Sequence, residues 1–150
     1  MWQIIKKICC AVCHSDDLIL SPTSFEEITI DELRSLLQDK FPEADIYLSD
    51  KIYKLCSLSD ITSFLKQDQT NRYEFVSESM DCDDFAYRLM GQCSIPEWSA
   101  LAFGICWTDK HALNCLVDSK KKFYFIEPQK DTIQETLKAW QGSMVRLVIM

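Results

Sequence analysis

The apolar positions of residues 30–41 recur at the spacing of a helix that is buried along one side. Thr29 and Glu32 frame its start in the arrangement of a capping box, and Pro42 cannot continue a helix. An amphipathic surface helix is therefore predicted here. Its apolar face is formed by Leu33, Leu36 and Leu37.

A second helix is predicted from Ser57 or Ser59, either of which can cap it, and the polar run at residues 67–72 ends it. The two stretches before it, 44–49 and 51–56, are short and mixed, so they predict no definite element. The apolar face of the second helix is formed by Leu58, Ile61, Phe64 and Leu65.

Residues 73–80 show no regular pattern and lead into a third helix, for which Asp81 is the predicted N-cap. The helix is predicted to run to Met90 and to end at Gly91, with Cys82 in its first turn. One side of this helix is buried, because apolar residues recur along it at helical spacing. They are Phe85, Ala86, Leu89 and Met90.

The second half of the chain consists of apolar runs separated by turns, which is the pattern of a sheet. Residues 118–122 are predicted to join two of these runs as a hairpin loop. Because helices come first and the sheet follows, the predicted fold class is α+β, in a single domain that covers residues 1–150. The predicted strands are Ala100–Trp107, His111–Val117, Phe123–Glu127 and Met144–Met150.

One further helix is predicted between the last two of these strands. Asp131 would cap it and Gly142 would end it. Its apolar face would be formed by Ile133, Leu137 and Trp140.

Charge narrows the range of partners. The 150 residues include 16 basic and 23 acidic side chains, for a net charge of −7. We expect no nucleic-acid binding, because contact with phosphates relies on clustered Lys and Arg. An acidic surface is compatible with hard cations such as calcium. The apolar fraction of 47% is sufficient for a globular core.

The eight cysteines indicate the compartment. An even number would permit a disulfide framework, but the N-terminal residues lack the apolar stretch of a secretory signal. Cys106 and Cys115 lie in apolar strands, where a free thiol packs as a small hydrophobe. We therefore expect reduced thiols, in the cytoplasm or another reducing compartment. No run approaches the ~20 apolar residues of a membrane span, so no membrane partner is expected.

Cys10, Cys13 and His14 form the pattern C-x-x-C-H, which is found where c-type haem is attached. That attachment requires export, for which no signal is present. A zinc site that used Cys9 or Cys10 with Cys13 and His14 would need a fourth ligand, and no second C-x-x-C follows. Inward packing of these cysteines is the favoured interpretation, and zinc and haem remain alternatives.

Cys82 is the first candidate for chemistry. The backbone N–H groups and the dipole of a helix N-terminus favour a thiolate there. The neighbouring acids Asp81, Asp83 and Asp84 disfavour it. A cation bound at Asp83 and Asp84 would remove this conflict, so the acids and the thiol together predict a metal site.

His111 and Glu127 are the candidates for base and orienting acid. The midpoint between them is Ser119, inside the predicted hairpin loop, and a hairpin centred there pairs the two positions directly. Side chains that face each other in this way share one face of the sheet, with Cβ atoms ~5 Å apart. Glu127 could then fix the ring tautomer and leave the other ring nitrogen for Cys82. Gln129, held near the strand end by Pro128, offers a hard oxygen suited to calcium.

Three short motifs in this order resemble the C-terminal domain of the Marasmius oreades agglutinin and its relatives. They are Cys82-Asp83-Asp84-Phe85-Ala86, His111-Ala112-Leu113-Asn114 and Ile126-Glu127-Pro128-Gln129, and the resemblance covers roughly residues 45 to 135. No Q-x-W carbohydrate-binding repeat accompanies them, so no glycan binding is expected.

The resemblance implies a papain-like fold. It also implies the activity of a calcium-dependent cysteine protease, with a protein or peptide as substrate. It implies that Cys82 is the nucleophile, His111 the base and Glu127 the third member of a triad. By the same resemblance, the implied calcium ligands are Asp83, Asp84 and Gln129. The backbone N–H of Cys82 is the default oxyanion donor.

Two alternatives remain open on the sequence. A transglutaminase-like enzyme or a cell-wall amidase of the same broad group would use Cys, His and acid in this order. A non-catalytic binding or structural module that retains the fold, encoded by a phage or another mobile element, would use none of them.

Overall fold

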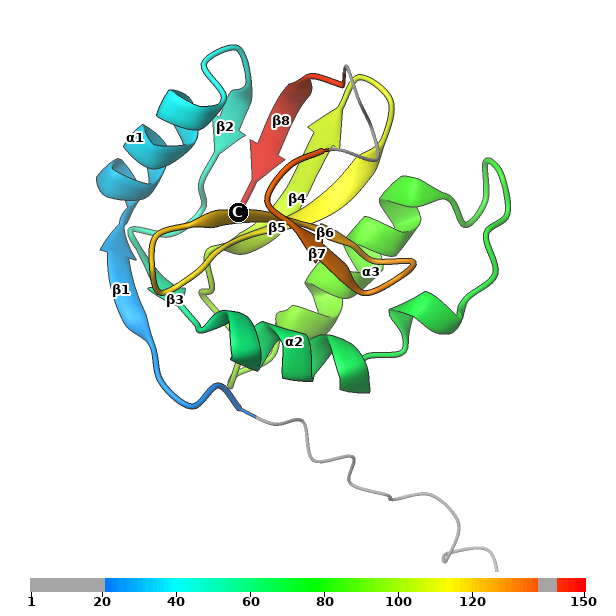
Figure 1. The fold of residues 1–150 in the computed structure, drawn as a ribbon, viewed down its shortest axis with the longest axis horizontal. Helices are drawn as coiled ribbons and strands as arrows, with labels where there is room; N and C mark the ends of the chain where they lie inside the picture. Colours follow the sequence, from blue (N-terminus) through cyan, green and yellow to red (C-terminus); the bar gives the residue numbers. More distant parts are fainter. Residues whose placement is uncertain (1–20, 138–142) are drawn as a thin grey trace, which may run out of the picture.

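The computed structural model describes residues 21–137 and 143–150 and packs helices onto a mostly antiparallel six-stranded sheet (Figure 1). This arrangement confirms the predicted α+β class. The elements are β1 (Glu26–Thr29), α1 (Ile30–Lys40), β2 (Asp45–Tyr47), β3 (Ile52–Leu55), α2 (Leu58–Gln67), the 3₁₀ turn η2 (Thr70–Arg72), α3 (Cys82–Cys93), β4 (Phe103–Thr108), β5 (Ala112–Val117), β6 (Phe123–Glu127), β7 (Thr132–Gln134) and β8 (Val145–Ile149).

The large sheet has the order β2-β8-β4-β5-β6-β7. Its neighbouring strands are antiparallel except for β2 and β8, which run parallel. A separate antiparallel pair, β1 with β3, lies beside it. The two stretches without a definite prediction, 44–49 and 51–56, thus contain β2 and β3, which are too short to show a clear alternation.

The core has two parts, because both faces of the large sheet are covered. Successive residues of β4, β5 and β6 point to opposite faces of the sheet, so they contribute in turn to one part of the core and to the other. One part joins the sheet to α1 and the small sheet, through Leu33, Leu37, Ile28, Tyr53, Cys106, Cys115 and Phe125. The other joins it to α2 and α3, through Ile61, Phe64, Leu89, Phe103, Leu116 and Ile126.

The first two predicted helices are confirmed, with their caps. The side chain of Thr29 accepts the N–H of Glu32, and the carboxylate of Glu32 accepts the N–H of Thr29. Of the two predicted caps for α2, Ser57 is the one used, and it forms a capping box with Asp60.

The predicted end of α3 is wrong. The helix passes through Gly91 and ends at Cys93, with Ser94 as its C-cap. A glycine inside a helix costs only about 1 kcal/mol relative to alanine. Cys93 is buried and continues the apolar face beyond Leu89, so packing outweighs the helix-breaking tendency of Gly91.

The helix predicted after Asp131 is also wrong at its start. Asp131 has a φ of 51°, and residues Thr132–Gln134 form β7, which pairs Ile133 with Ile126 of β6. Asp is favoured in turns as well as at helix caps, and here it closes the turn after β6. Residues 138–142, which include Trp140 and Gly142, lie outside the described residues.

Cys56, Cys82, Cys93, Cys106 and Cys115 are free thiols, which agrees with the prediction of reduced cysteines for this part of the chain. Cys9, Cys10, Cys13 and His14 lie outside the described residues, so their role stays a prediction. Among the helices that the structure describes, none has the length and apolar character of a membrane span.

Candidate active site

Cys82 is the first residue of α3, as the sequence predicts. Asp81 is the N-cap, and its backbone N–H donates to the carboxylate of Asp84 at 3.1 Å. The first N–H groups of a helix have no partner within it, so the helix end favours a negative charge on the partly buried thiol, whereas the nearby carboxylates of Asp81 and Asp83 oppose it.

The side chain of Cys82 packs against a small buried cluster formed by Ala86, Ile105 and Ala112. Ala112 is the first residue of β5 and directly follows His111. The thiol and the imidazole therefore lie toward the same end of β5, although they are 29 positions apart in the sequence.

Asn114 connects α3, the helix that begins with Cys82, to the sheet. Its side-chain amide is fully buried and donates to the carbonyl oxygen of Ala86 at 2.9 Å and to that of Gly104 at 3.1 Å. It therefore ties α3 to both β5 and β4. The sequence shows only a polar residue within an apolar strand, and this role was not predicted.

The backbone of His111 is held by a tight turn between β4 and β5. The Thr108 hydroxyl accepts the N–H of His111 at 2.9 Å and donates to its carbonyl oxygen at 3.0 Å. The N–H of Thr108 also donates to that carbonyl. Thr108 was not singled out in the sequence, although Thr side chains often bond to nearby backbone groups in turns.

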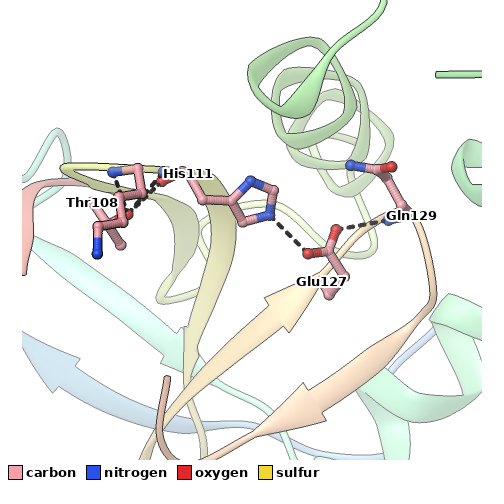
Figure 2. A network of polar contacts seen from close by, with 5 residues as sticks. Thr108, His111, Glu127 and Gln129 are labelled. Carbon is pink, nitrogen blue, oxygen red and sulfur yellow. Dashed lines mark hydrogen bonds and ion pairs between the residues drawn. The ribbon is translucent and has the colours of Figure 1, made fainter. Parts of the chain in front are cut away.

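His111 and Glu127 form the contact that the sequence predicts. Nε2 of His111 lies 2.8 Å from Oε2 of Glu127, and the two residues are only 8% and 7% exposed (Figure 2). The second carboxylate oxygen, Oε1, accepts the backbone N–H of Gln129 at 3.3 Å. Both oxygens of Glu127 are therefore engaged, and its orientation is fixed.

The hairpin register differs from the predicted one. Val117 pairs with Phe123 and Asn114 with Ile126, which centres the turn on residue 120 and not on Ser119. Continued along the strands, this register places Glu127 opposite position 113, two residues from His111. A shift of two keeps both side chains on one face, so the predicted contact survives as a diagonal pair.

The acids around Cys82 are arranged differently from the predicted pair. Ligand atoms of Asp81, Cys82 and Asp83 lie within 4.8 Å of one another, while Asp84 binds the cap N–H. A hydrogen bond between the two carboxyls lowers the pKa of Asp81 and raises that of Asp83. Asp81 was predicted only as a cap, so it is an addition to the candidate cation ligands.

The other four described thiols are unsuited to nucleophilic chemistry. Burial raises the pKa of Cys56 and of Cys106 to about 12. Burial also raises the pKa of Cys93 and of Cys115 well above the usual value. Among the described cysteines, Cys82 alone is not fully buried.

No family model matches this chain, and no curated protein matches it. Solved structures do. A complex of PSL1a, a Polyporus squamosus lectin, with E64 superposes with a TM-score of 0.72 and 24% sequence identity, over 83% of this chain and 50% of that one. This chain has the same fold.

A second structure of Polyporus squamosus lectin, bound to a human-type influenza-binding epitope, matches with a TM-score of 0.67 and 21% identity. The match covers 49% of that lectin chain, so this chain spans about half the length of each of the two matched proteins. The papain-like fold predicted from the three motifs is thereby confirmed.

Proposed function

We propose that the protein is a cysteine peptidase or amidase that acts through a thioester on Cys82. The observation that carries the proposal is the buried pair of His111 and Glu127 at the end of β5 where α3 presents Cys82. The fold adds support, because the structural relative PSL1a was solved with E64, an inhibitor of papain-like cysteine proteases.

The pair defines how His111 would act. A carboxylate only accepts, so Nε2–H of His111 would donate to Glu127 and, in the neutral ring, Nδ1 would be the acceptor. Nδ1 would take the proton of the Cys82 thiol as the sulfur attacks a substrate carbonyl carbon. The resulting imidazolium would protonate the leaving amine, and Glu127 would stabilise its charge.

The second half of the reaction uses the same groups. His111 would deprotonate a water molecule, which attacks the thioester and releases the acid product and the Cys82 thiol. The oxyanion that forms in each half lies near the N-terminus of α3. The backbone N–H of Cys82 is the proposed donor there, since it has no acceptor within the helix.

We propose calcium as the cation, with Asp83, Asp84 and Gln129 as ligands and Asp81 added. Support comes from the carboxylates of Asp81 and Asp83, whose oxygens lie within 4.8 Å of each other and of the Cys82 sulfur. Oxygen donors of this kind suit calcium. Bound there, the ion would supply positive charge beside the thiol.

Peptide hydrolysis tests the proposal. Denatured casein or a mixed peptide library is incubated with the protein in calcium chloride, and new amino termini are counted. We expect release by the unaltered protein and none by Cys82→Ala, with Cys106→Ala as the matched control that retains activity. Equal release by Cys82→Ala would overturn the assignment of Cys82.

A further inference from the structure

A loop of apolar and acidic residues directly precedes Cys82. We call residues 73–80 the flanking loop, and Figure 1 shows it projecting from the molecule before the start of α3. Phe75 is 53% exposed and Val76 48%. Single exposed apolar residues are common, but two adjacent ones beside a candidate site offer apolar surface to a ligand.

The flanking loop is ordered by hydrogen bonds of its own. Val76 bridges to Met80, and its carbonyl oxygen accepts the N–H groups of Ser79 and Met80 at 3.1 and 2.8 Å. Glu78 adopts a φ of 62°, and its N–H donates to the carboxylate of Asp81 at 3.2 Å. The loop is thus tied to Asp81, the N-cap of α3.

The base of the loop is also fixed. The guanidinium of Arg88, on α3, lies 4.1 Å from the centre of the Tyr73 ring, within the range of a cation–π contact. These contacts order the chain on both sides of Phe75 and Val76, whose side chains are exposed. A surface prepared in this way binds a ligand at a lower entropic cost.

The loop is within reach of the same substrate as the thiol. Paired antiparallel residues have Cα atoms no more than about 5.5 Å apart, and consecutive Cα atoms are about 3.8 Å apart. Through the bridge to Met80, the Cα of Val76 therefore lies within about 13 Å of that of Cys82. An extended peptide covers this distance in about four residues, at about 3.3 Å each.

Charge adds a second preference. The segment from Tyr73 to Tyr87 contains no Lys or Arg. Its acids are Glu74, Glu78, Asp81, Asp83 and Asp84. Glu74 and Glu78 are exposed, and their carboxylates are not among the candidate cation ligands, so their charge would be available to a basic group.

We propose that the flanking loop is a wall of the substrate site and selects extended peptides that carry an apolar side chain next to a basic one. The inference rests on the proposed function for its reaction and extends it to the class of substrate. Phe75 and Val76 supply the apolar contact, and Glu74 and Glu78 supply the charge.

Two fluorogenic peptides test the selection, one with central leucines flanked by lysines and one with central serines flanked by glutamates. We expect the first to have a kcat/KM at least tenfold higher, and the double variant Phe75→Ser, Val76→Ser to reduce that ratio at least fivefold. Tyr47→Ser removes an aromatic ring from β2 that is at least as exposed as Phe75 and should leave the ratio unchanged. Circular dichroism confirms that each variant is folded.

Binding separates this inference from the proposed function. The same peptides are titrated into Cys82→Ala, which cannot react. Preferential binding of the leucine–lysine peptide supports the wall even if the unaltered protein hydrolyses nothing, in which case the proposed function falls. Hydrolysis of both peptides at equal rates, or a ratio that the double variant does not change, overturns the wall and leaves the proposed function standing.

Discussion

At the scale of single residues, Glu127 is the most constrained group of the site. One oxygen accepts from the His111 ring and the other from the backbone N–H of Gln129. Pro128, between Glu127 and Gln129 in the chain, restricts the backbone at this point. A carboxylate can accept both hydrogen bonds and carries a negative charge, whereas every neutral side chain lacks that charge.

Glu127→Gln therefore tests the role of the carboxylate. His111 and Gln129 donate to different oxygens of Glu127, so in the amide one of the two donors would face an NH2 group, and the amide offers no charge to an imidazolium. We expect kcat for peptide hydrolysis to fall about a hundredfold, with KM nearly unchanged. Glu135→Gln, at an exposed position, is the control. An unchanged kcat in Glu127→Gln would remove the residue from the mechanism.

Asn114 makes a separate prediction about stability. Its amide donates two buried hydrogen bonds that join α3 to the sheet. Asn114→Ala should reduce the free energy of unfolding by about 1–3 kcal/mol, measured by urea denaturation. Gln67→Ala, which removes an exposed amide bonded only within α2, should change it by less than about 0.5 kcal/mol. Equal effects of the two substitutions would contradict this role for Asn114.

At the scale of elements, the sequence predicted those features that neighbouring residues in the chain determine. The caps at Thr29 and Ser57 and the hairpin loop after β5 follow from residues close together in the chain. The end of α3 and the strand after Asp131 were mispredicted, because contacts with distant residues decide them. Cys93 packs in the core, and Ile133 pairs with Ile126.

The two described glycines of the core elements give opposite predictions for alanine. A Cβ on Gly91 would meet no atom within 4 Å, so Gly91→Ala should stabilise α3 by about 0.5–1 kcal/mol. A Cβ on Gly104 would lie 1.8 Å from the carbonyl oxygen of Ile149, so Gly104→Ala must push β4 away from β8. Thermal unfolding should show a higher Tm for Gly91→Ala and a much lower one for Gly104→Ala. A lower Tm for Gly91→Ala would contradict the continuous helix.

The proposed calcium site in the first turn of α3 makes a prediction about affinity. Asp83→Asn removes one carboxylate of the hydrogen-bonded pair with Asp81, and we expect it to weaken calcium binding at least tenfold in calorimetric titration. Asp39→Asn removes an exposed acid from α1 and should leave the affinity unchanged. Identical isotherms for the two variants would exclude the first turn as the calcium site.

At the scale of the molecule, the fold brings three distant motifs to one end of β5. The sequence predicted the His111–Glu127 contact through the hairpin, even though the register is shifted by two positions. It did not predict Asn114 or Thr108 as supports, because both act across elements whose packing is not visible in the chain. It also left the parallel pairing of β2 with β8 undetermined, since about a hundred residues separate them.

The central claim is that Cys82 is a nucleophile activated by its surroundings, and labelling with E64 tests it most directly. The protein is treated with E64 in calcium chloride, digested, and the adduct is mapped by mass spectrometry. We predict a single adduct on Cys82, formed much more slowly in His111→Ala, while the four buried thiols stay unlabelled. Labelling spread over the cysteines, or equal labelling of Cys82 with and without His111, would contradict the account.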